Sequence, residues 1–181
     1  MWVIEGASTQ ATVFMLEGCG LVTCAHVLGE ENLFLYSPLD PLQRYPVTGE
    51  RHDNERDVAI LEAAGIPKHK ELRVGDSTKL RLHDPITLMG FPEHAKGDEG
   101  IVHRGEITSE RRIRFGQGRI LISAPIVGGN SGGPVLDSRN RVIGIAATGA
   151  DKFENTTATS NFGVIPIETL LEFRGETSTG G

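Results

Sequence analysis

The chain has 181 residues, a formal net charge of −6 and 38% hydrophobic residues. That length is enough for one or two small units sharing a substantial core. The negative net charge gives no excess of basic residues, which argues against nucleic-acid binding. Because no stretch approaches about 18 consecutive apolar residues, we expect no membrane span or membrane partner.

Short apolar runs between turn signals make up the first half of the chain. The runs that predict strands are Thr12–Leu16, Gly20–Thr23, Asn32–Tyr36, Tyr45–Thr48 and Val58–Ala63. A single turn of helix is expected at His26–Leu28. Regular short strands in a chain with 23 glycines and nine prolines favour an all-β fold.

Two cysteines, Cys19 and Cys24, lie in this half. Within one extended strand they would be too far apart to form a disulfide, although a hairpin could bring them close. Small secreted domains usually need several disulfides, so we expect two reduced thiols. The N-terminus lacks a basic region and a long apolar core, so we expect no signal peptide and a cytoplasmic location. Two cysteines and dispersed histidines do not make a metal site, and we expect no metal and no cofactor.

Two segments of this half place a polar side chain beside an apolar run. His26 follows Leu21–Ala25, and Asp57 opens the run Asp57–Leu61. Alone, such a histidine is more often a packed or surface residue, and such an aspartate a cap. Together they are a general base and the carboxylate that orients it, which a nucleophilic serine requires.

The second half continues the pattern of short strands and ends in a helix. The expected strands are Pro85–Phe91, Ile101–Ser109, Arg112–Phe115, Arg119–Ala124, Pro134–Asp137, Arg141–Thr148 and Phe162–Pro166. Pro166–Phe173 begins with proline and carries apolar residues at helical spacing, which predicts a helix. The tail Gly175–Gly181 is rich in Gly, Ser and Thr, typical of a flexible linker.

A glycine-rich segment, Gly128–Pro134, surrounds Ser131. Glycines allow positive φ and a close approach of the backbone to a substrate. Consecutive amides in such a loop can form an anion-binding nest, so Gly129, Asn130 and Ser131 are the candidate oxyanion hole. The plain alternative is a glycine-rich turn between two strands.

With these three segments the chain resembles a trypsin-like (chymotrypsin-fold) serine protease. His26, Asp57 and Ser131 follow one another in that family's order. Thr23–His26 resembles its Thr-Ala-Ala-His, Asp57–Leu61 its Asp-Ile-Ala-Leu-Leu, and Gly129–Pro134 its Gly-Asp-Ser-Gly-Gly-Pro. The short gaps and the plain Asn130 are most similar to bacterial HtrA-like and stand-alone trypsin-like peptidase domains. The resemblance covers residues 8–173.

This resemblance implies two six-stranded antiparallel β-barrels and a short C-terminal helix. Residues 1–75 would form the N-terminal barrel with His26 and Asp57. Residues 76–174 would form the C-terminal barrel, with the nucleophile, oxyanion hole and specificity pocket, together with the helix. Residues 175–181 would be a flexible tail. The active site would lie in the cleft between the barrels.

The resemblance also implies a primary specificity pocket. Its base would be Pro125, Ile126 and Val127, and its walls Ala147, Thr148 and Gly149 on one side and Phe162, Gly163 and Val164 on the other. None is acidic, so an Arg or Lys side chain would lack a counter-charge, and apolar residues are expected there. Asp151 and Glu154 in the adjacent loop could reverse this preference. Alternatively, these apolar residues simply pack the second barrel.

The expected function is therefore a serine endopeptidase acting on peptide or protein substrates through an acyl-enzyme. Asn130 carries no charge to pair with a new N-terminus, so no zymogen cleavage is expected. A catalytically silent trypsin-fold binding or regulatory module remains an alternative, as does an esterase or amidase with the same triad. Further domains or a regulatory partner outside this chain are compatible with its length.

Overall fold

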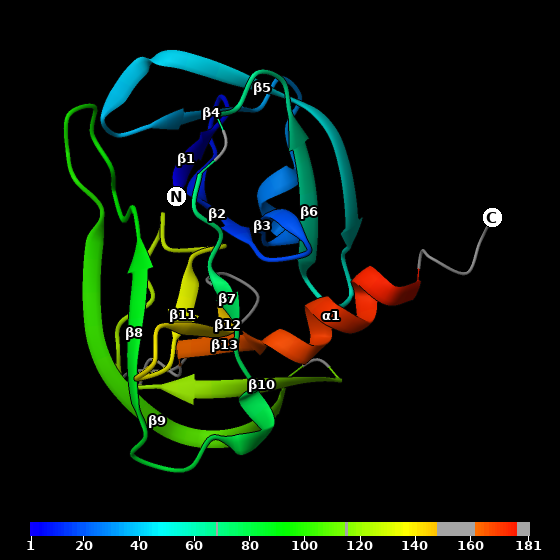
Figure 1. The fold of residues 1–181 in the computed structure, drawn as a ribbon, viewed down its shortest axis with the longest axis vertical. Helices are drawn as coiled ribbons and strands as arrows, with labels where there is room; N and C mark the ends of the chain where they lie inside the picture. Colours follow the sequence, from blue (N-terminus) through cyan, green and yellow to red (C-terminus); the bar gives the residue numbers. More distant parts are fainter. Residues whose placement is uncertain (68, 115, 148–161, 177–181) are drawn as a thin grey trace.

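The computed structural model describes residues 1–67, 69–114, 116–147 and 162–176. In these ranges, thirteen strands, two 3-10 turns and one α-helix follow one another along the chain (Figure 1). The strands form two barrels, one from each half of the sequence, and the helix follows the last strand. No helix in the described ranges is long and apolar enough to cross a membrane.

The first barrel is a closed ring of six strands. In chain order they are β1 (Trp2–Glu5), β2 (Gln10–Leu16), β3 (Gly20–Thr23), β4 (Phe34–Ser37), β5 (Asp40–Asp53) and β6 (Val58–Ala63). The ring runs β1-β2-β3-β6-β5-β4, and its neighbouring strands are antiparallel. Apolar side chains such as Ile4, Phe14 and Leu35 are fully buried in its core.

The second barrel is also a closed ring of six antiparallel strands. They are β8 (Pro85–Gly90), β9 (Ile101–Arg114), β10 (Gln117–Ile122), β11 (Pro134–Leu136), β12 (Arg141–Ala147) and β13 (Phe162–Pro166). The sheet runs β11-β8-β9-β10-β13-β12, and pairing of β11 with β12 closes it. Its core includes Ile86, Leu88, Ile107 and Ile143. The predicted architecture of two six-stranded antiparallel barrels is confirmed.

Most strands lie within about two residues of their predicted bounds, the two-residue β7 (Arg73–Val74) was not predicted, and β1, β5 and β9 differ most from the prediction. β1 was not predicted, although Trp2, Val3 and Ile4 are buried between β2 and β4. β5 runs over Asp40–Asp53 rather than a short central piece, and β9 is one strand where two were predicted. Many side chains in these two long strands are exposed, so no alternation of apolar residues marks them. Backbone pairing with neighbouring strands holds them instead.

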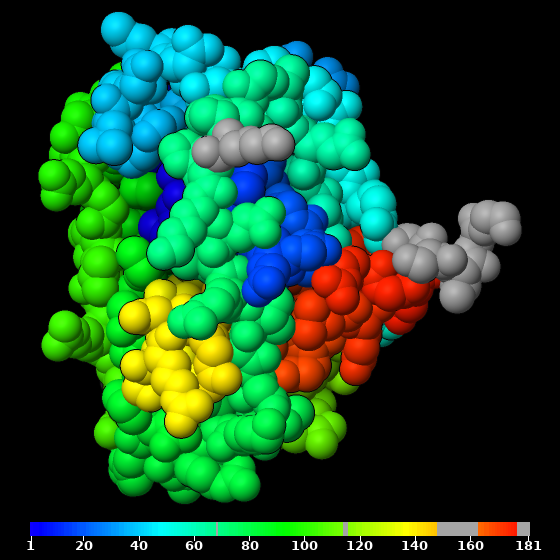
Figure 2. All heavy atoms as spheres, viewed as in Figure 1, coloured from blue at the N-terminus to red at the C-terminus, as the bar shows by residue number. Residues whose placement is uncertain are grey.

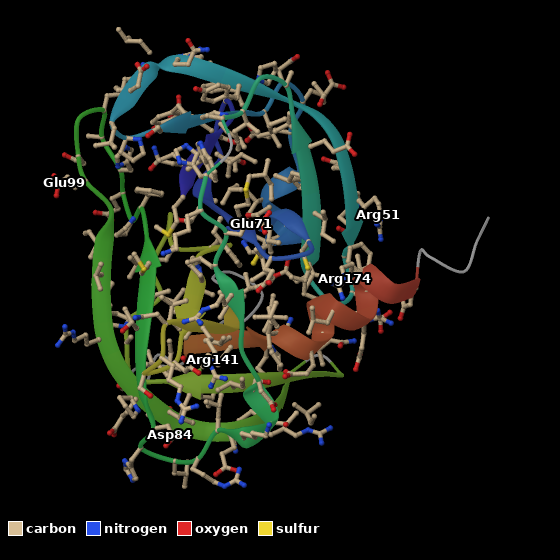
Figure 3. The ribbon with its side chains drawn as sticks, in the orientation of Figure 1. Arg51, Glu71, Asp84, Glu99, Arg141 and Arg174 are labelled. Atoms are coloured by element: carbon tan, nitrogen blue, oxygen red, sulfur yellow. The ribbon has the colours of Figure 1, made fainter. Side chains whose placement is uncertain are left out.

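The helix α1 (Ile167–Glu176) connects the two barrels. It buries Ile167, Leu170 and Phe173 in the core that also contains the first-barrel side chains. The guanidinium of Arg51, on β5, lies 5.3 Å from the centre of the Phe173 ring, and Figure 3 shows Arg51 beside the helix. Residues 175 and 176, predicted to belong to a flexible tail, form the end of this helix. The rest of that predicted tail, 177–181, lies outside the described residues.

The segment between the barrels forms hydrogen bonds with both of them. Leu72 donates its N–H to the carbonyl of Met15 in β2 at 2.8 Å. Directly after Leu72, β7 (Arg73–Val74) pairs in parallel with β12. In Figure 2 this teal-to-green segment runs down the front face, over the boundary between the barrels. The 3-10 turn η2 (Ser77–Lys79) follows and leads to β8.

Candidate active site

His26 lies on the 3-10 turn η1 (Ala25–Leu28), directly after β3. Its neighbours Ala25 and Val27 are buried and anchor the turn, while 36% of the His26 side chain is exposed. The backbone N–H of His26 donates to Asp57 Oδ1 at 2.9 Å. The same carboxylate therefore holds both the backbone and the ring of this histidine.

Asp57 stands just before β6 and is 5% exposed. Its backbone has a left-handed φ of +61°, which aspartate tolerates better than most residues with a Cβ. Both carboxylate oxygens lie 2.9 Å from His26 Nδ1. A carboxylate can only accept, so Nδ1 carries the hydrogen and Nε2 is left as an acceptor. The Ser131 Oγ lies 3.1 Å from that Nε2. The structure thus brings the three predicted side chains into one row.

Ser131 belongs to the loop between β10 and β11, and two glycines of this loop combine a positive φ with no room for a side chain. Gly129 has a φ of +93° and Gly132 a φ of +80°. A Cβ on Gly129 would lie 2.2 Å from the Phe91 carbonyl oxygen, and one on Gly132 would lie 2.1 Å from Thr23 Oγ1. Glycine is therefore required at both positions by backbone angle and by close approach.

Backbone hydrogen bonds set the orientation of the peptides in this loop. The Gly128 carbonyl accepts from the Glu93 N–H at 3.2 Å, and the Asn130 carbonyl accepts from the Gly133 N–H at 2.9 Å. In a trans peptide the N–H points away from the preceding C=O. The N–H groups of Gly129 and Ser131 are therefore directed away from those two bonded carbonyls, as an oxyanion hole needs.

Asn130 differs from its predicted role. Its N–H donates to the Val127 carbonyl at 3.0 Å, so this amide is engaged inside the loop. Its side chain is fully buried, with Nδ2 3.5 Å from the Pro125 carbonyl oxygen. Asn130 thus supports the loop, and the candidate oxyanion donors are the N–H groups of Gly129 and Ser131.

Cys24 lies beside the His26–Asp57 pair without joining it through a hydrogen bond. It is fully buried, and its Sγ donates to the Ala146 carbonyl at 3.3 Å. Burial, with a further effect of the Asp57 charge, raises the pKa of this thiol well above its ordinary value. Both cysteines are free in the structure.

In the described part of the chain, one group of side chains offers three metal-ligand types. Possible ligand atoms of Cys24, His26 and Asp57 lie within 4.8 Å of one another. Each of these side chains already takes part in a hydrogen bond, and a metal would have to displace the Asp57–His26 pair. The geometry therefore favours use of these residues without a metal.

The predicted specificity pocket is described only in part. Ile126 packs in the core of the second barrel. Ala147 packs in the core that contains the first-barrel side chains and those of α1. Pro125 is exposed and Gly163 is buried. Thr148 and Gly149 lie outside the described residues, as do Asp151 and Glu154. None of the described pocket positions carries a charge.

Sequence reasoning missed the residues that hold the catalytic loop from outside it. Thr12 on β2 and Glu93 after β8 bond directly to this loop, and the Phe91 N–H donates to Thr12 Oγ1. Phe91 and Glu93 act through backbone groups, and the residue type does not indicate which backbone groups form such bonds. Thr12 is a polar residue in an apolar run, a weak signal for a buried hydrogen bond.

Comparison with known proteins bears on the family and the fold of this chain. Residues 11–145 match the family model of the trypsin-like peptidase domain. The protein y4bJ of Sinorhizobium fredii is 30% identical over 93% of this chain, and protease Do-like 2 of Arabidopsis thaliana chloroplasts is 28% identical over 92%. The chain spans only 26% and 28% of the lengths of these two relatives.

Solved structures share the fold. The HtrA-type protease AlgW with a tripeptide superposes with a TM-score of 0.77 at 23% identity, over 99% of this chain and 60% of that one. The family match covers most of the chain, and the relatives of this chain include a Do-like protease. The chain therefore belongs to the trypsin-like peptidase domain family, in the style of the HtrA serine proteases.

Proposed function

We propose that this chain is a serine endopeptidase that hydrolyses peptide bonds through a triad of Ser131, His26 and Asp57. The observation that carries the proposal is the row of short contacts from Asp57 through Nδ1 and Nε2 of His26 to the Ser131 Oγ, at 2.9 and 3.1 Å. These are hydrogen-bond distances, within which a proton can pass from the hydroxyl to the imidazole.

In the first half of the reaction, Ser131 Oγ attacks the carbonyl carbon of the scissile bond. Its proton passes to His26 Nε2, and Asp57 stabilises the imidazolium without becoming protonated. His26 then gives that proton to the leaving amine, the C–N bond breaks and an ester to Ser131 remains. Water attacks this acyl-enzyme with His26 again as the base, which releases the acid and restores the serine.

The negative oxygen of each tetrahedral intermediate would be held by the N–H groups of Gly129 and Ser131. The fixed carbonyls of Gly128 and Asn130 support this orientation. Each such donor contributes about 2.7–4 kcal/mol of transition-state stabilisation in enzymes where one can be removed.

We further propose that the substrates are peptides or proteins with an apolar residue on the acyl side of the cleaved bond. The described pocket positions Pro125, Ile126, Ala147 and Gly163 offer no counter-charge for Arg or Lys. Burying an unpaired cation there would be costly. Because this chain spans about a quarter of its relatives' length, further domains or a regulatory partner would refine that choice.

No zymogen cleavage is part of this proposal. In the digestive members of the family that the chain resembles, an aspartate before the nucleophile pairs with a newly cut N-terminus. Here that position is the uncharged, buried Asn130. Val3–Glu5, whose sequence resembles such a start, forms part of β1 and pairs with β2 and β4.

The first test is Ser131→Ala, with a fluorophosphonate as a probe of the nucleophile. We expect peptide cleavage and covalent labelling to disappear while the free energy of unfolding stays close to that of the wild type. His26→Ala should cause a comparable loss, and the double variant should be no worse, because the residues act as a unit. Cleavage assays and denaturant unfolding measure these outcomes.

Residual cleavage by Ser131→Ala within tenfold of the wild type would contradict the proposal. A wild-type chain that takes no label would indicate the silent binding module instead. A labelled chain that turns over esters but no peptide in a broad library would indicate an esterase. Testing one labelled preparation on both substrate types separates these functions.

A further inference from the structure

Thr12 is a fully buried threonine on β2 of the first barrel, and it contacts the catalytic loop of the second. Thr12 and Gly129 are 117 positions apart in the sequence. Buried hydroxyls are retained where they form hydrogen bonds, because an unpaired one is costly. Thr12 forms these bonds with the loop that carries Ser131.

Three hydrogen bonds connect Thr12 to this region. Its Oγ1 donates to the Gly129 carbonyl at 2.7 Å and accepts from the Phe91 N–H at 3.1 Å. Its N–H donates to the Ser131 carbonyl at 2.9 Å. The single hydroxyl thus uses both its donor and an acceptor lone pair, bridging the end of β8 and the loop.

With these bonds, each backbone carbonyl from Gly128 to Ser131 has a hydrogen-bond partner. The carbonyls of Gly128 and Asn130 are held by Glu93 and Gly133, and those of Gly129 and Ser131 by Thr12. The Gly129–Asn130 peptide lies between the two peptides that carry the oxyanion donors. Two glycines leave this backbone with wide conformational freedom, so an external hydrogen bond has a large effect on its orientation.

We propose that Thr12 is a positioning residue, whose hydroxyl holds the Gly129 peptide so that the oxyanion donors are arranged before substrate binds. This inference deepens the proposed peptidase function and rests on it. Thr12 acts through the loop and touches no reacting atom. Its contribution should appear in the transition state, where the oxyanion develops, rather than in substrate binding.

The test compares Thr12→Val, which keeps the shape and removes the hydroxyl, with Thr12→Ser, which keeps the hydroxyl. The concentration of active sites is taken from fluorophosphonate labelling carried to completion, and kcat is calculated per labelled site. On this basis Thr12→Val should lose about tenfold to a hundredfold in kcat, and its KM should change less than about threefold. Removing one oxyanion donor outright costs about a hundredfold to a thousandfold, and this change only loosens the donors. Affinity for a peptide trifluoromethyl ketone, whose adduct carries an oxyanion, should fall in parallel.

A second readout does not depend on activity. Amide hydrogen exchange in a peptide covering residues 126–133 should be faster in Thr12→Val and close to wild type in Thr12→Ser. Tyr36→Phe is the matched control, because the hydroxyl of Tyr36, a buried residue of the same barrel, donates at 3.1 Å to Glu5 Oε2 and not to a loop carbonyl. It should lose similar thermal stability while keeping kcat within about threefold and exchange in the loop unchanged.

Unchanged kcat and unchanged loop exchange in Thr12→Val would overturn the inference. So would a Thr12→Ser variant as impaired as Thr12→Val, because the methyl group would then be what matters. A loss of kcat in Tyr36→Phe equal to that in Thr12→Val would also overturn it, since loss of any buried hydroxyl of this barrel would then have the same effect. If Ser131→Ala kept its activity, the proposed function would fail, and the exchange data alone would decide whether Thr12 orders the loop.

Discussion

At the scale of single residues, the site places unfavourable backbone angles where the chemistry needs them. Asp57 has a left-handed φ of +61° even though it carries a Cβ. A residue in that conformation costs about 1–3 kcal/mol, which the surroundings must offset. The hydrogen bonds from the backbone N–H and the ring of His26 to the Asp57 carboxylate help to offset this cost. The same two bonds orient the His26 ring.

Cys24 gives a prediction at the same scale. Iodoacetamide at pH 8 should leave peptide cleavage unchanged, because burial raises the pKa of this thiol well above its ordinary value. A raised pKa keeps the thiol protonated at pH 8, and the thiolate is the reactive form. The measurement is residual activity after alkylation, with mass spectrometry to locate the modified cysteine. Inactivation that Cys24→Ala prevents would contradict the burial argument, whereas a Cys24→Ala variant without any activity would contradict the serine mechanism.

At the scale of elements, the β11–β12 hairpin closes the second barrel three residues after the nucleophile. Its turn is organised by the Asp137 carboxylate, which accepts from the N–H groups of Arg139 and Arg141 at 2.8 and 2.9 Å. The Arg141 side chain, labelled in Figure 3, forms an ion pair with the same carboxylate at 2.7 Å. One side chain therefore defines the turn that sets the pairing of β11 with β12.

We expect Asp137→Ala to lower the free energy of unfolding at pH 7 by about 1–3 kcal/mol, because the hydrogen bonds that Arg139 and Arg141 donate to this charged group would be lost. Burial alone would raise the pKa of Asp137, but the hydrogen bonds from Arg141 and Arg139 outweigh it and lower that pKa. The stabilisation should thus be complete above the ordinary aspartate value of about 3.9 and disappear as the pH falls through the lower folded value.

Denaturant unfolding of wild type and Asp137→Ala at pH 7 and at pH 3 measures this difference. The gap between the two proteins should shrink at the lower pH. Asp98→Ala is the control, since it removes the same charge from an exposed turn. There the carboxylate accepts one hydrogen bond, from the Ala95 N–H. A gap that widens on acidification would show that the carboxylate destabilises the hairpin.

At the scale of the whole molecule, the site depends on how closely the two barrels approach. His26 and Asp57 come from the first barrel and Ser131 from the second, and Gly132 lies against the first barrel. A Cβ there would lie 2.1 Å from Thr23 Oγ1 and 2.3 Å from the Thr12 carbonyl oxygen. The barrels could not accommodate it without moving apart.

Gly132→Ala should therefore reduce both stability and kcat/KM strongly. Gly20→Ala is the matched control, because Gly20 has a similar φ of +83° but open space within 4 Å of the point that a Cβ would occupy. Both variants incur the backbone penalty of about 1–2 kcal/mol, and only Gly132→Ala pushes on the barrel interface. Urea unfolding and cleavage assays distinguish the two. Equal losses in both variants would show that the interface tolerates the extra methyl group.

Much of the site could be predicted because its signals are local in the sequence. The glycines around Ser131, the small residues before His26 and the apolar run after Asp57 each reflect a need of their own segment. The fold class followed from the same short runs and turns. The helix was expected from Pro166–Phe173, and it occupies Ile167–Glu176.

Tertiary structure alone decided which groups hold these segments in place. The hydroxyl of Thr12 meets partners 79 and 117 positions away, and Phe91, Glu93 and Gly128 contribute backbone atoms. Backbone donors and acceptors are the same in every residue type except proline, so no pattern of side chains identifies the ones that bond. Likewise much of the length of β5 and β9 has exposed side chains, and these parts are held by pairing with the neighbouring strands. The sequence by itself therefore predicted a serine-peptidase site and determined the class of fold, and only the packing of the two barrels determined how the loop around Ser131 is oriented.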